Sequence, residues 1–160
     1  SLRLFITHFE NNMIPETFNV NSILEKEKKF DLTEIKTYKK FSNNINQIKT
    51  NLVNFIEKAK KESKHIICYG APAKGNTLLN YCKISKDLID YAVDKNPNKQ
   101  NLFLPGTHIP IVSPEKIKET KPDFILILPW NLKDEIINEL QYVKSWGCQF
   151  IIPMPEIKVL

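Results

Sequence analysis

A short apolar strand that runs into a glycine turn and then a helix is the feature that most constrains the fold of this chain. The strand is His65–Tyr69, the turn carries Gly70 and Gly75, and a helix pattern follows from about Asn76 to Lys83. The chain holds only four glycines, so two of them five residues apart mark a backbone that turns tightly or approaches another group closely.

The chemistry of this turn favours an anion. Backbone N–H groups at the start of a helix point outward, and the helix dipole favours negative charge there. The sequence matches neither a Walker loop nor Gly-x-Gly-x-x-Gly, and a plain strand-to-helix turn is the alternative. The candidate residues for a phosphate or diphosphate are Gly70, Ala71, Pro72, Lys74, Gly75 and Asn76.

Strand and helix patterns alternate from His65 to the end of the chain. We expect strands at His65–Tyr69, Leu88–Asp94, Asp123–Leu128 and Cys148–Ile152, with a short extended piece at Ile109–Val112. A helix capped by Ser113 should end at Pro122, and another should run from Leu132 to Trp146 before Gly147. This order predicts an α/β fold with a small doubly wound, mostly parallel, Rossmann-like sheet of four strands, the last at Cys148–Ile152.

A long amphipathic helix precedes this sheet. Its apolar positions are spaced alternately by three and four residues over about eight turns, and Asp31 or Thr33 can cap its start. We expect the stripe to pack on the domain's own sheet or on a neighbouring domain rather than in a coiled coil. The stripe consists of Tyr38, Phe41, Ile45, Ile48, Leu52, Phe55 and Ala59.

The N-terminal residues indicate a chain cut from a larger protein. It begins at Ser1 without an initiator methionine, and Leu2–Thr7 alternates like a strand from the outset. A polar turn at Glu10–Pro15 and a short charged helix at Asn19–Lys29 follow. We therefore divide the sequence into residues 1–15 as the end of a preceding domain, 16–63 as linking helices and 64–160 as the Rossmann-like domain.

Composition excludes several classes of function. The net charge is +5, but Arg3 is the only arginine, and lysines alternate with glutamates as in Glu25–Lys29, so no nucleic-acid partner is expected. No apolar run could span a membrane and no signal peptide begins the chain, so we expect a cytoplasmic protein. Cys68, Cys82 and Cys148 lack metal-binding spacing and should be buried free thiols, which leaves no metal site.

Polar residues follow the strands at the edge where a parallel sheet binds ligands. Asp94 comes 24 residues after Gly70, where it could accept hydrogen bonds from ribose hydroxyls or serve only as a turn residue. Trp130 could stack on a base or sugar beside Asn131, or pack against another domain. The binding candidates at this edge are Asp94, Asn96, Lys99, His108, Trp130 and Asn131.

No catalytic set emerges from the sequence. His8, His65 and His108 are scattered, and no serine or cysteine has a histidine and a carboxylate at a recognisable spacing. His108, in the loop Leu104–His108, is the only histidine expected at the ligand edge, where a structural or substrate contact suits it better than the role of a base. Polar loops without an acid–base pair are typical of a binding domain.

Together these stretches resemble the C-terminal domain of the S-adenosylmethionine-dependent C-methyltransferases that act on nucleotide-linked deoxysugars. Ser1-Leu2-Arg3 is similar to the end of the Gly-Gly-Ser-Leu/Ile-Arg segment that closes the preceding methyltransferase domain in that family. Asn101 stands where the family has glycine, and Cys68 where a small residue is usual. The matching stretches are Tyr69–Asn80, Asp94–Gln100, Leu104–Ile111, Leu126–Glu135 and Phe150–Pro155.

The resemblance implies a three-part enzyme with a zinc-binding N-terminal domain, a central S-adenosylmethionine domain that carries the catalytic groups, and this domain on the substrate side. It implies methyl transfer to a sugar carbon through an enolate beside a ketone. The partners would be the nucleotide-sugar substrate and the preceding domains of the same polypeptide, and the fragment alone should be inactive. A dinucleotide-binding oxidoreductase-like domain and an interdomain scaffold without a ligand are the two alternatives.

Overall fold

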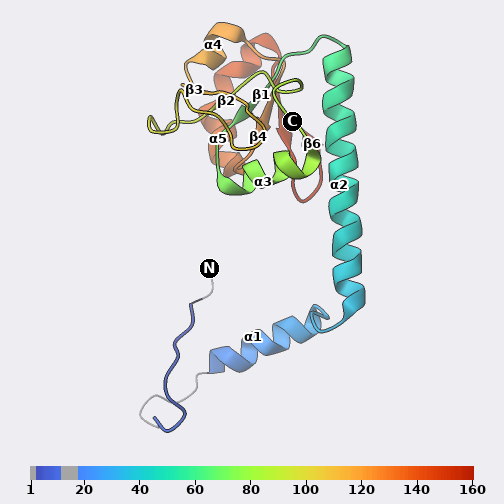
Figure 1. The fold of residues 1–160 in the computed structure, drawn as a ribbon, viewed down its shortest axis with the longest axis vertical. Coiled ribbons are helices and arrows are strands. Elements are labelled where there is room, and N and C mark those ends of the chain that lie inside the picture. The colour runs from blue at the N-terminus through green and yellow to red at the C-terminus, as the bar shows by residue number, and fades with distance from the viewer. Residues whose placement is uncertain (1–2, 12–17) are drawn as a thin grey trace. The chain divides into compact units, whose positions relative to one another are not determined.

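The computed structural model describes residues 3–11 and 18–160 of the chain. These residues belong to two compact units, residues 1–43 and 44–160, and the boundary falls within a long helix. Figure 1 follows the chain from the first unit in blue to the last strand in red.

The first unit contains α1 (Phe18–Lys29) and the beginning of α2 (Ile35–Lys61). The helix predicted at Asn19–Lys29 is confirmed, and α1 has no buried residue. The strand predicted at Leu2–Thr7 is wrong over Arg3–Thr7, which have no regular secondary structure, because no strand among the described residues pairs with them. Leu2 and most of the turn predicted at Glu10–Pro15 lie outside the described residues.

The predicted long helix is present as α2, and its residues from Asn44 onward belong to the second unit. Leu52, Ile56 and Ala59 are buried in one cluster with strand residues, and Phe55 is half-buried against it, so the predicted packing on the domain's own sheet is confirmed there. Tyr38 and Phe41, at the other end of the stripe, are exposed.

A six-stranded sheet forms the centre of the second unit. Its strand order is β3-β2-β1-β4-β5-β6, with the first five strands parallel and β6 antiparallel to β5. The predicted α/β, mostly parallel fold is therefore confirmed. The strands are β1 (Ile66–Tyr69), β2 (Ala92–Val93), β3 (Ile111–Val112), β4 (Phe124–Ile127), β5 (Gln149–Ile152) and β6 (Lys158–Val159).

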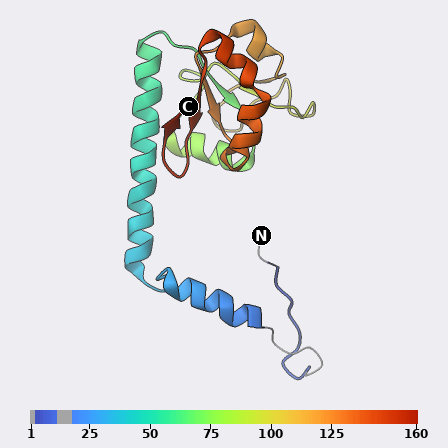
Figure 2. The same cartoon turned by 180° about the vertical axis from the view of Figure 1, so that it is seen from behind.

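Alternating residues of the strands supply two apolar cores, one on each face of the sheet. Ile66 and Cys68 of β1 pack with α2 and with α3 (Ala73–Cys82). Ile67 and Tyr69 face the opposite layer. That layer contains α4 (Lys116–Thr120), α5 (Lys133–Glu139) and the 3₁₀ segment η2 (Gln141–Trp146), which are best seen from behind in Figure 2. Because both faces are covered, β1 is buried throughout, as its unbroken apolar sequence predicts.

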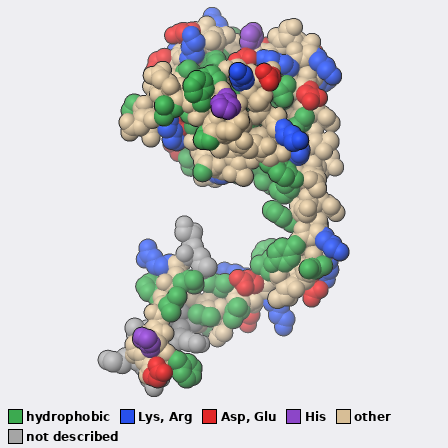
Figure 3. Space-filling view, viewed as in Figure 1, with side chains coloured by type: hydrophobic (Ala, Val, Ile, Leu, Met, Phe, Trp, Pro, Cys, Tyr) green, Lys and Arg blue, Asp and Glu red, His purple; other side chains and the backbone are tan. Residues whose placement is uncertain are grey.

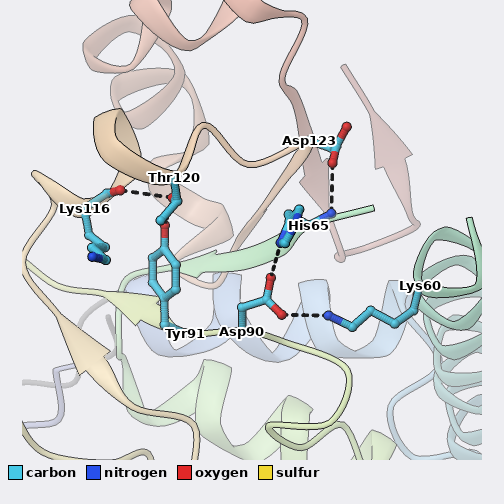
Figure 4. A network of polar contacts seen from close by, with 7 residues as sticks. All are labelled: Lys60, His65, Asp90, Tyr91, Lys116, Thr120 and Asp123. Carbon is cyan, nitrogen blue, oxygen red and sulfur yellow. Dashed lines mark hydrogen bonds and ion pairs between the residues drawn. The ribbon is translucent and has the colours of Figure 1, made fainter. Parts of the chain in front are cut away.

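A polar network fixes the amino-terminal end of β1, opposite the ligand edge (Figure 4). Asp90 Oδ1 accepts a hydrogen bond from Lys60 Nζ at 2.6 Å, and Asp90 Oδ2 pairs with His65 Nδ1 at 3.1 Å. The backbone N–H of His65 donates to Asp123 Oδ2 at 2.9 Å. The network thus ties α2 to the sheet.

Several predicted elements differ from the structure. The sheet has six strands rather than four, because the extended piece predicted at Ile109–Val112 pairs with β2 as β3, and β6 pairs with β5 at the other edge. The strand predicted at Leu88–Asp94 is only Ala92–Val93, since Leu88 lies in a turn whose N–H groups bond back to Ser85. Helix α4 follows Glu115 without a side-chain cap, so Ser113 does not cap it.

The helix predicted from Leu132 to Trp146 is divided. It comprises the 3₁₀ segment η1 (Trp130–Leu132), α5 and η2. Leu140 leaves helical geometry with φ −93° and ψ 19°, yet Leu140 and Val143 are both buried, so packing under the sheet overrides helical periodicity. Gly147 ends the segment at φ 82°, as its position predicts. Among the described residues, no helix combines the length and apolarity that crossing a bilayer requires.

Candidate functional site

The candidate site lies at the carboxyl ends of β1 and β4, where the strand order reverses. Gly70 follows β1 with φ +81°, and a Cβ at this position would stand 2.8 Å from Cδ of Pro129, which follows β4. Only glycine fits both constraints. The two loops therefore meet in contact at the switch point.

Helix α3 begins earlier than predicted, at Ala73, so Lys74, Gly75 and Asn76 lie in its first turn rather than in a loop. A Cβ on Gly75 would approach Cβ of Leu128 to 2.6 Å, so this glycine lets the helix lie against the end of β4. Within the described part of the chain, the N–H groups of Ala73, Lys74 and Gly75 have no hydrogen-bond partner, while that of Asn76 bonds to Pro72.

Lys74, Trp130 and Asn131 come together as the sequence predicts for neighbouring strand ends. The Lys74 ammonium lies 4.5 Å from the centroid of the Trp130 ring and donates a hydrogen bond to Asn131 Oδ1. Trp130 and Asn131 belong to η1, which begins directly after Pro129. A cation is therefore held at the mouth of the sheet by an aromatic face and a neutral amide, and no carboxylate of the described residues pairs with it.

Asp94 fastens the glycine turn to the loop after β2. Its Oδ2 accepts from the N–H of Ala71 at 2.8 Å and from Lys99 Nζ at 3.2 Å, and its Oδ1 accepts from the N–H of Asn96 at 2.9 Å. Burial raises the pKa of the carboxyl, but these three hydrogen bonds outweigh it and hold the pKa below its ordinary value. Both carboxylate oxygens already accept hydrogen bonds from the chain itself. Asp94 therefore fits the role of a turn residue better than the role of an acceptor for ribose hydroxyls.

Asn96 and Lys99, the other candidates on this loop, also make hydrogen bonds that hold the loop in its conformation. Asn96 Oδ1 accepts from the N–H of Asn98, and Lys99 Nζ reaches across to the carbonyl of Ala71 at 3.0 Å. Asn101 has φ 64°, the left-handed region that favours glycine and that asparagine tolerates. This conformation explains how asparagine can stand where glycine was expected.

His108 does not join the other candidates. It lies exposed directly after a turn, with φ 56°, and its N–H donates to the carbonyl of Leu104. It lines neither of the two hollows described below. The predicted substrate contact of His108 has no support from this arrangement.

Two hollows flank the glycine turn. The first, of about 330 Å³, lies between the start of α3 and the loop after β2, and is lined by Ala71, Pro72, Ala73, Asn76, Lys99, Leu102, Phe103, Leu104, Pro105 and Ile111. The second, of about 190 Å³, is lined by Tyr69, Gly70, Asp94, Lys95, Pro129, Leu132, Glu135, Ile136 and Glu139. Candidate residues from two segments of the sequence, the glycine turn with the start of α3 and the loop after β2, thus border these spaces, whereas Trp130 and Asn131 line neither.

The sequence reasoning missed part of both hollows. Leu102 and Phe103 form an apolar run inside a loop, and this exposed run was the signal that could have pointed to a ligand surface. Glu139 forms an ion pair of 2.5 Å with Lys95 across the second hollow, a long-range pairing that carries no sequence signal. Within the described residues, no cluster of metal-binding side chains occurs.

Comparison with known proteins agrees with this geometry. Residues 1–155 match the family model described as the C-methyltransferase C-terminal domain. The chain is also 34% identical over 142 residues to the C-methyltransferase NovU of Streptomyces niveus. That alignment covers 88% of this chain and 34% of NovU, so the chain spans about a third of the length of the curated relative that it matches. The chain belongs to the family of C-methyltransferase C-terminal domains.

Proposed function

We propose that this chain is the substrate-side domain of an enzyme that transfers a methyl group from S-adenosylmethionine to a carbon of a nucleotide-linked deoxysugar. The family membership supports methyl transfer to carbon. The proposal that the substrate carries a nucleotide rests on the start of α3. Three N–H groups of its first turn have no partner among the described residues, and the Lys74 side chain belongs to the same turn. Lys99 lines the adjoining hollow. N–H groups, a helix dipole and lysines together favour a diphosphate.

The residues of this chain do not fit S-adenosylmethionine or a dinucleotide. Asp94, the acid in the position that would receive ribose hydroxyls, already accepts hydrogen bonds from Ala71, Asn96 and Lys99. The backbone of Gly75 lies against the side chain of Leu128, so this glycine does not leave its backbone open for the pyrophosphate of a dinucleotide. When bound elsewhere in the enzyme, S-adenosylmethionine supplies the methyl group, and this chain contributes only the binding and orientation of the substrate. Zinc likewise belongs to another domain in this proposal.

The partner that we assign to the first unit is the remainder of the same polypeptide. Most of the exposed large apolar side chains of the described residues lie between Leu4 and Phe41, and Figure 3 shows them in green over this part of the chain. A patch of this kind marks a protein interface. The three buried free thiols suit a reducing compartment, so we place the enzyme in the cytoplasm.

The test is calorimetric titration of the chain with dTDP, NAD and S-adenosylmethionine. We expect dTDP to bind and the other two not to bind. Replacing Lys74 by alanine should weaken dTDP binding by about 1.5–3 kcal/mol, because a charge-assisted hydrogen bond to phosphate is lost. The control is Lys118→Ala, since Lys118 also lies over an aromatic ring, that of Tyr142, at 5.0 Å but belongs to α4 and not to the start of α3.

Two further outcomes would count against the proposal. Equal binding of dTDP by the Lys74→Ala and Lys118→Ala variants would make Lys74 a surface lysine. Methyl transfer to a nucleotide sugar by this chain alone, which we expect not to occur, would show that the catalytic groups lie within these residues.

A further inference from the structure

We propose that the first hollow, between the start of α3 and the loop after β2, binds the base of the nucleotide, so that the sugar extends toward the second hollow. The inference rests on the proposed function, because it assigns the two ends of the same ligand. It depends on the chemistry of the two linings, which differ on either side of the glycine turn.

The first hollow has the lining that a flat heterocycle requires. Apart from Asn76 and Lys99 its side chains are all apolar, and its volume of about 330 Å³ lies at the small end of ligand pockets. Phe103 and Leu102 are 61% and 55% exposed although they line this space. An uncovered aromatic ring beside a hollow is a surface on which a base can stack.

The position of the hollow fits one end of a nucleoside diphosphate. Ala73, whose N–H is free at the start of α3, belongs to its lining, so phosphates at the helix start would place an attached base within reach. Lys99 lines the same space, but its ammonium is paired with Asp94, so the positive charge at the helix start comes from Lys74 in the first turn. The charge and the apolar surface therefore match the two parts of one nucleotide.

The loop that carries Phe103 is held in place before any ligand arrives. Asn80 Nδ2 of α3 donates to the carbonyl of Pro105 at 3.0 Å, and the N–H of Ile111 donates to the carbonyl of Leu102 at 2.8 Å. Gly106 approaches Asn80 so closely that a Cβ there would stand 2.2 Å from Asn80 Oδ1. A wall fixed by these contacts costs little ordering entropy on binding.

The second hollow has the opposite character. Tyr69, Lys95, Glu135 and Glu139 supply hydroxyl, ammonium and carboxylate groups, which suit the hydroxyls of a sugar better than the face of a base. Trp130 directly follows Pro129, which lines this hollow, and Lys74 lies over the Trp130 ring. The base and the sugar are thus separated by the diphosphate at the start of α3.

The experiment compares the binding of dTDP and of inorganic pyrophosphate to the whole chain by calorimetry. Phe103→Ala should weaken dTDP binding by about 5- to 150-fold, the value of one base–aromatic stack, and change pyrophosphate binding less than about twofold. Phe41→Ala is the matched control, since Phe41 is 64% exposed and lines neither hollow. Methyl NMR signals of Leu102 and Leu104 should shift with dTDP but not with pyrophosphate.

The outcomes separate this inference from the function on which it rests. If dTDP binds and Phe103→Ala changes nothing, or weakens dTDP and pyrophosphate equally, the base does not occupy this hollow, and the proposed function stands. If the parent chain binds neither dTDP nor pyrophosphate, both proposals are wrong. A circular dichroism spectrum identical to that of the parent would show that the Phe103→Ala variant is folded.

Discussion

Asp94 illustrates how one side chain can decide the shape of a ligand edge without contacting a ligand. Its carboxylate joins the turn after β1 to the loop after β2, through the N–H groups of Ala71 and Asn96. Lys99 adds a charge to the same pair of segments and also bonds to the carbonyl of Ala71. The glycine turn is therefore positioned from the neighbouring strand as well as by its own backbone.

The lowered pKa of Asp94 makes a prediction about acid stability. Because the folded pKa lies below that of the unfolded chain, the stabilisation is present above about pH 4 and is lost as the pH falls through the folded value. Asp94→Asn should lower the free energy of unfolding by about 1–3 kcal/mol at pH 7 and much less at pH 2. Urea unfolding at both pH values measures this difference.

Asp123 also has a pKa held below its ordinary value, since the hydrogen bonds from Lys64 and His65 outweigh its burial. Its contribution is the same in the parent and in the Asp94→Asn variant, so it cancels in the comparison. If Asp94→Asn lowers the free energy of unfolding equally at pH 7 and pH 2, the negative charge of Asp94 does not stabilise the fold.

The three cysteines should be inert in the folded chain. Burial raises the pKa of the Cys148 thiol to about 12 and also raises the pKa values of Cys68 and Cys82. Thiolate is the reactive form, so we expect no reaction with a disulfide reagent at pH 8 until the chain unfolds, when all three should react. Rapid modification of one thiol in the native chain would place that cysteine at the surface.

At the level of elements, the sequence was informative wherever local pattern and tertiary packing agree. The long helix follows from the periodicity of the Tyr38 stripe, the helix near Asn19–Lys29 from its charged pattern, and the buried strands β1 and β4 from their unbroken apolar runs. It was uninformative where packing overrides local preference, as at Leu140, or where an edge strand such as β6 depends on a partner distant in sequence.

The candidate site was also predictable from the sequence only in part. The meeting of Lys74 with Trp130 and Asn131 follows from the rule that parallel strands end at one edge. The engagement of Asp94 by the chain's own N–H groups could not be foreseen, because sequence spacing does not show which donors approach a carboxylate.

Gly75 offers a test of how α3 is seated. Alanine favours a helix by about 1 kcal/mol over glycine. The added Cβ, however, would meet Cβ of the buried Leu128 at 2.6 Å, and overpacking of this kind costs about 1–3 kcal/mol. We expect the clash to prevail, so that Gly75→Ala lowers the midpoint of thermal unfolding. A raised midpoint would mean that α3 can move away from β4 freely.

At the scale of the whole molecule, the two units differ in what they bury. The second unit has apolar cores on both faces of its sheet, whereas α1 in the first unit has no buried residue. Helix α2 belongs to both, with Ile48 buried at 8% exposure and Phe41 exposed at 64%. One amphipathic stripe thus contains a position that supports the fold and a position free for a partner.

These two positions supply the final prediction. Ile48→Asp buries an unpaired charge and should destabilise the second unit by about 2–5 kcal/mol, whereas Phe41→Asp should change the free energy of unfolding by less than about 0.5 kcal/mol. Because an exposed apolar patch favours association, we also expect light scattering to show self-association of the parent chain that Phe41→Asp reduces. Unfolding of both variants would mean that the first half of the stripe is also part of the core. A dimer that becomes a folded monomer on Ile48→Asp would show that a second copy, and not the sheet, covers α2.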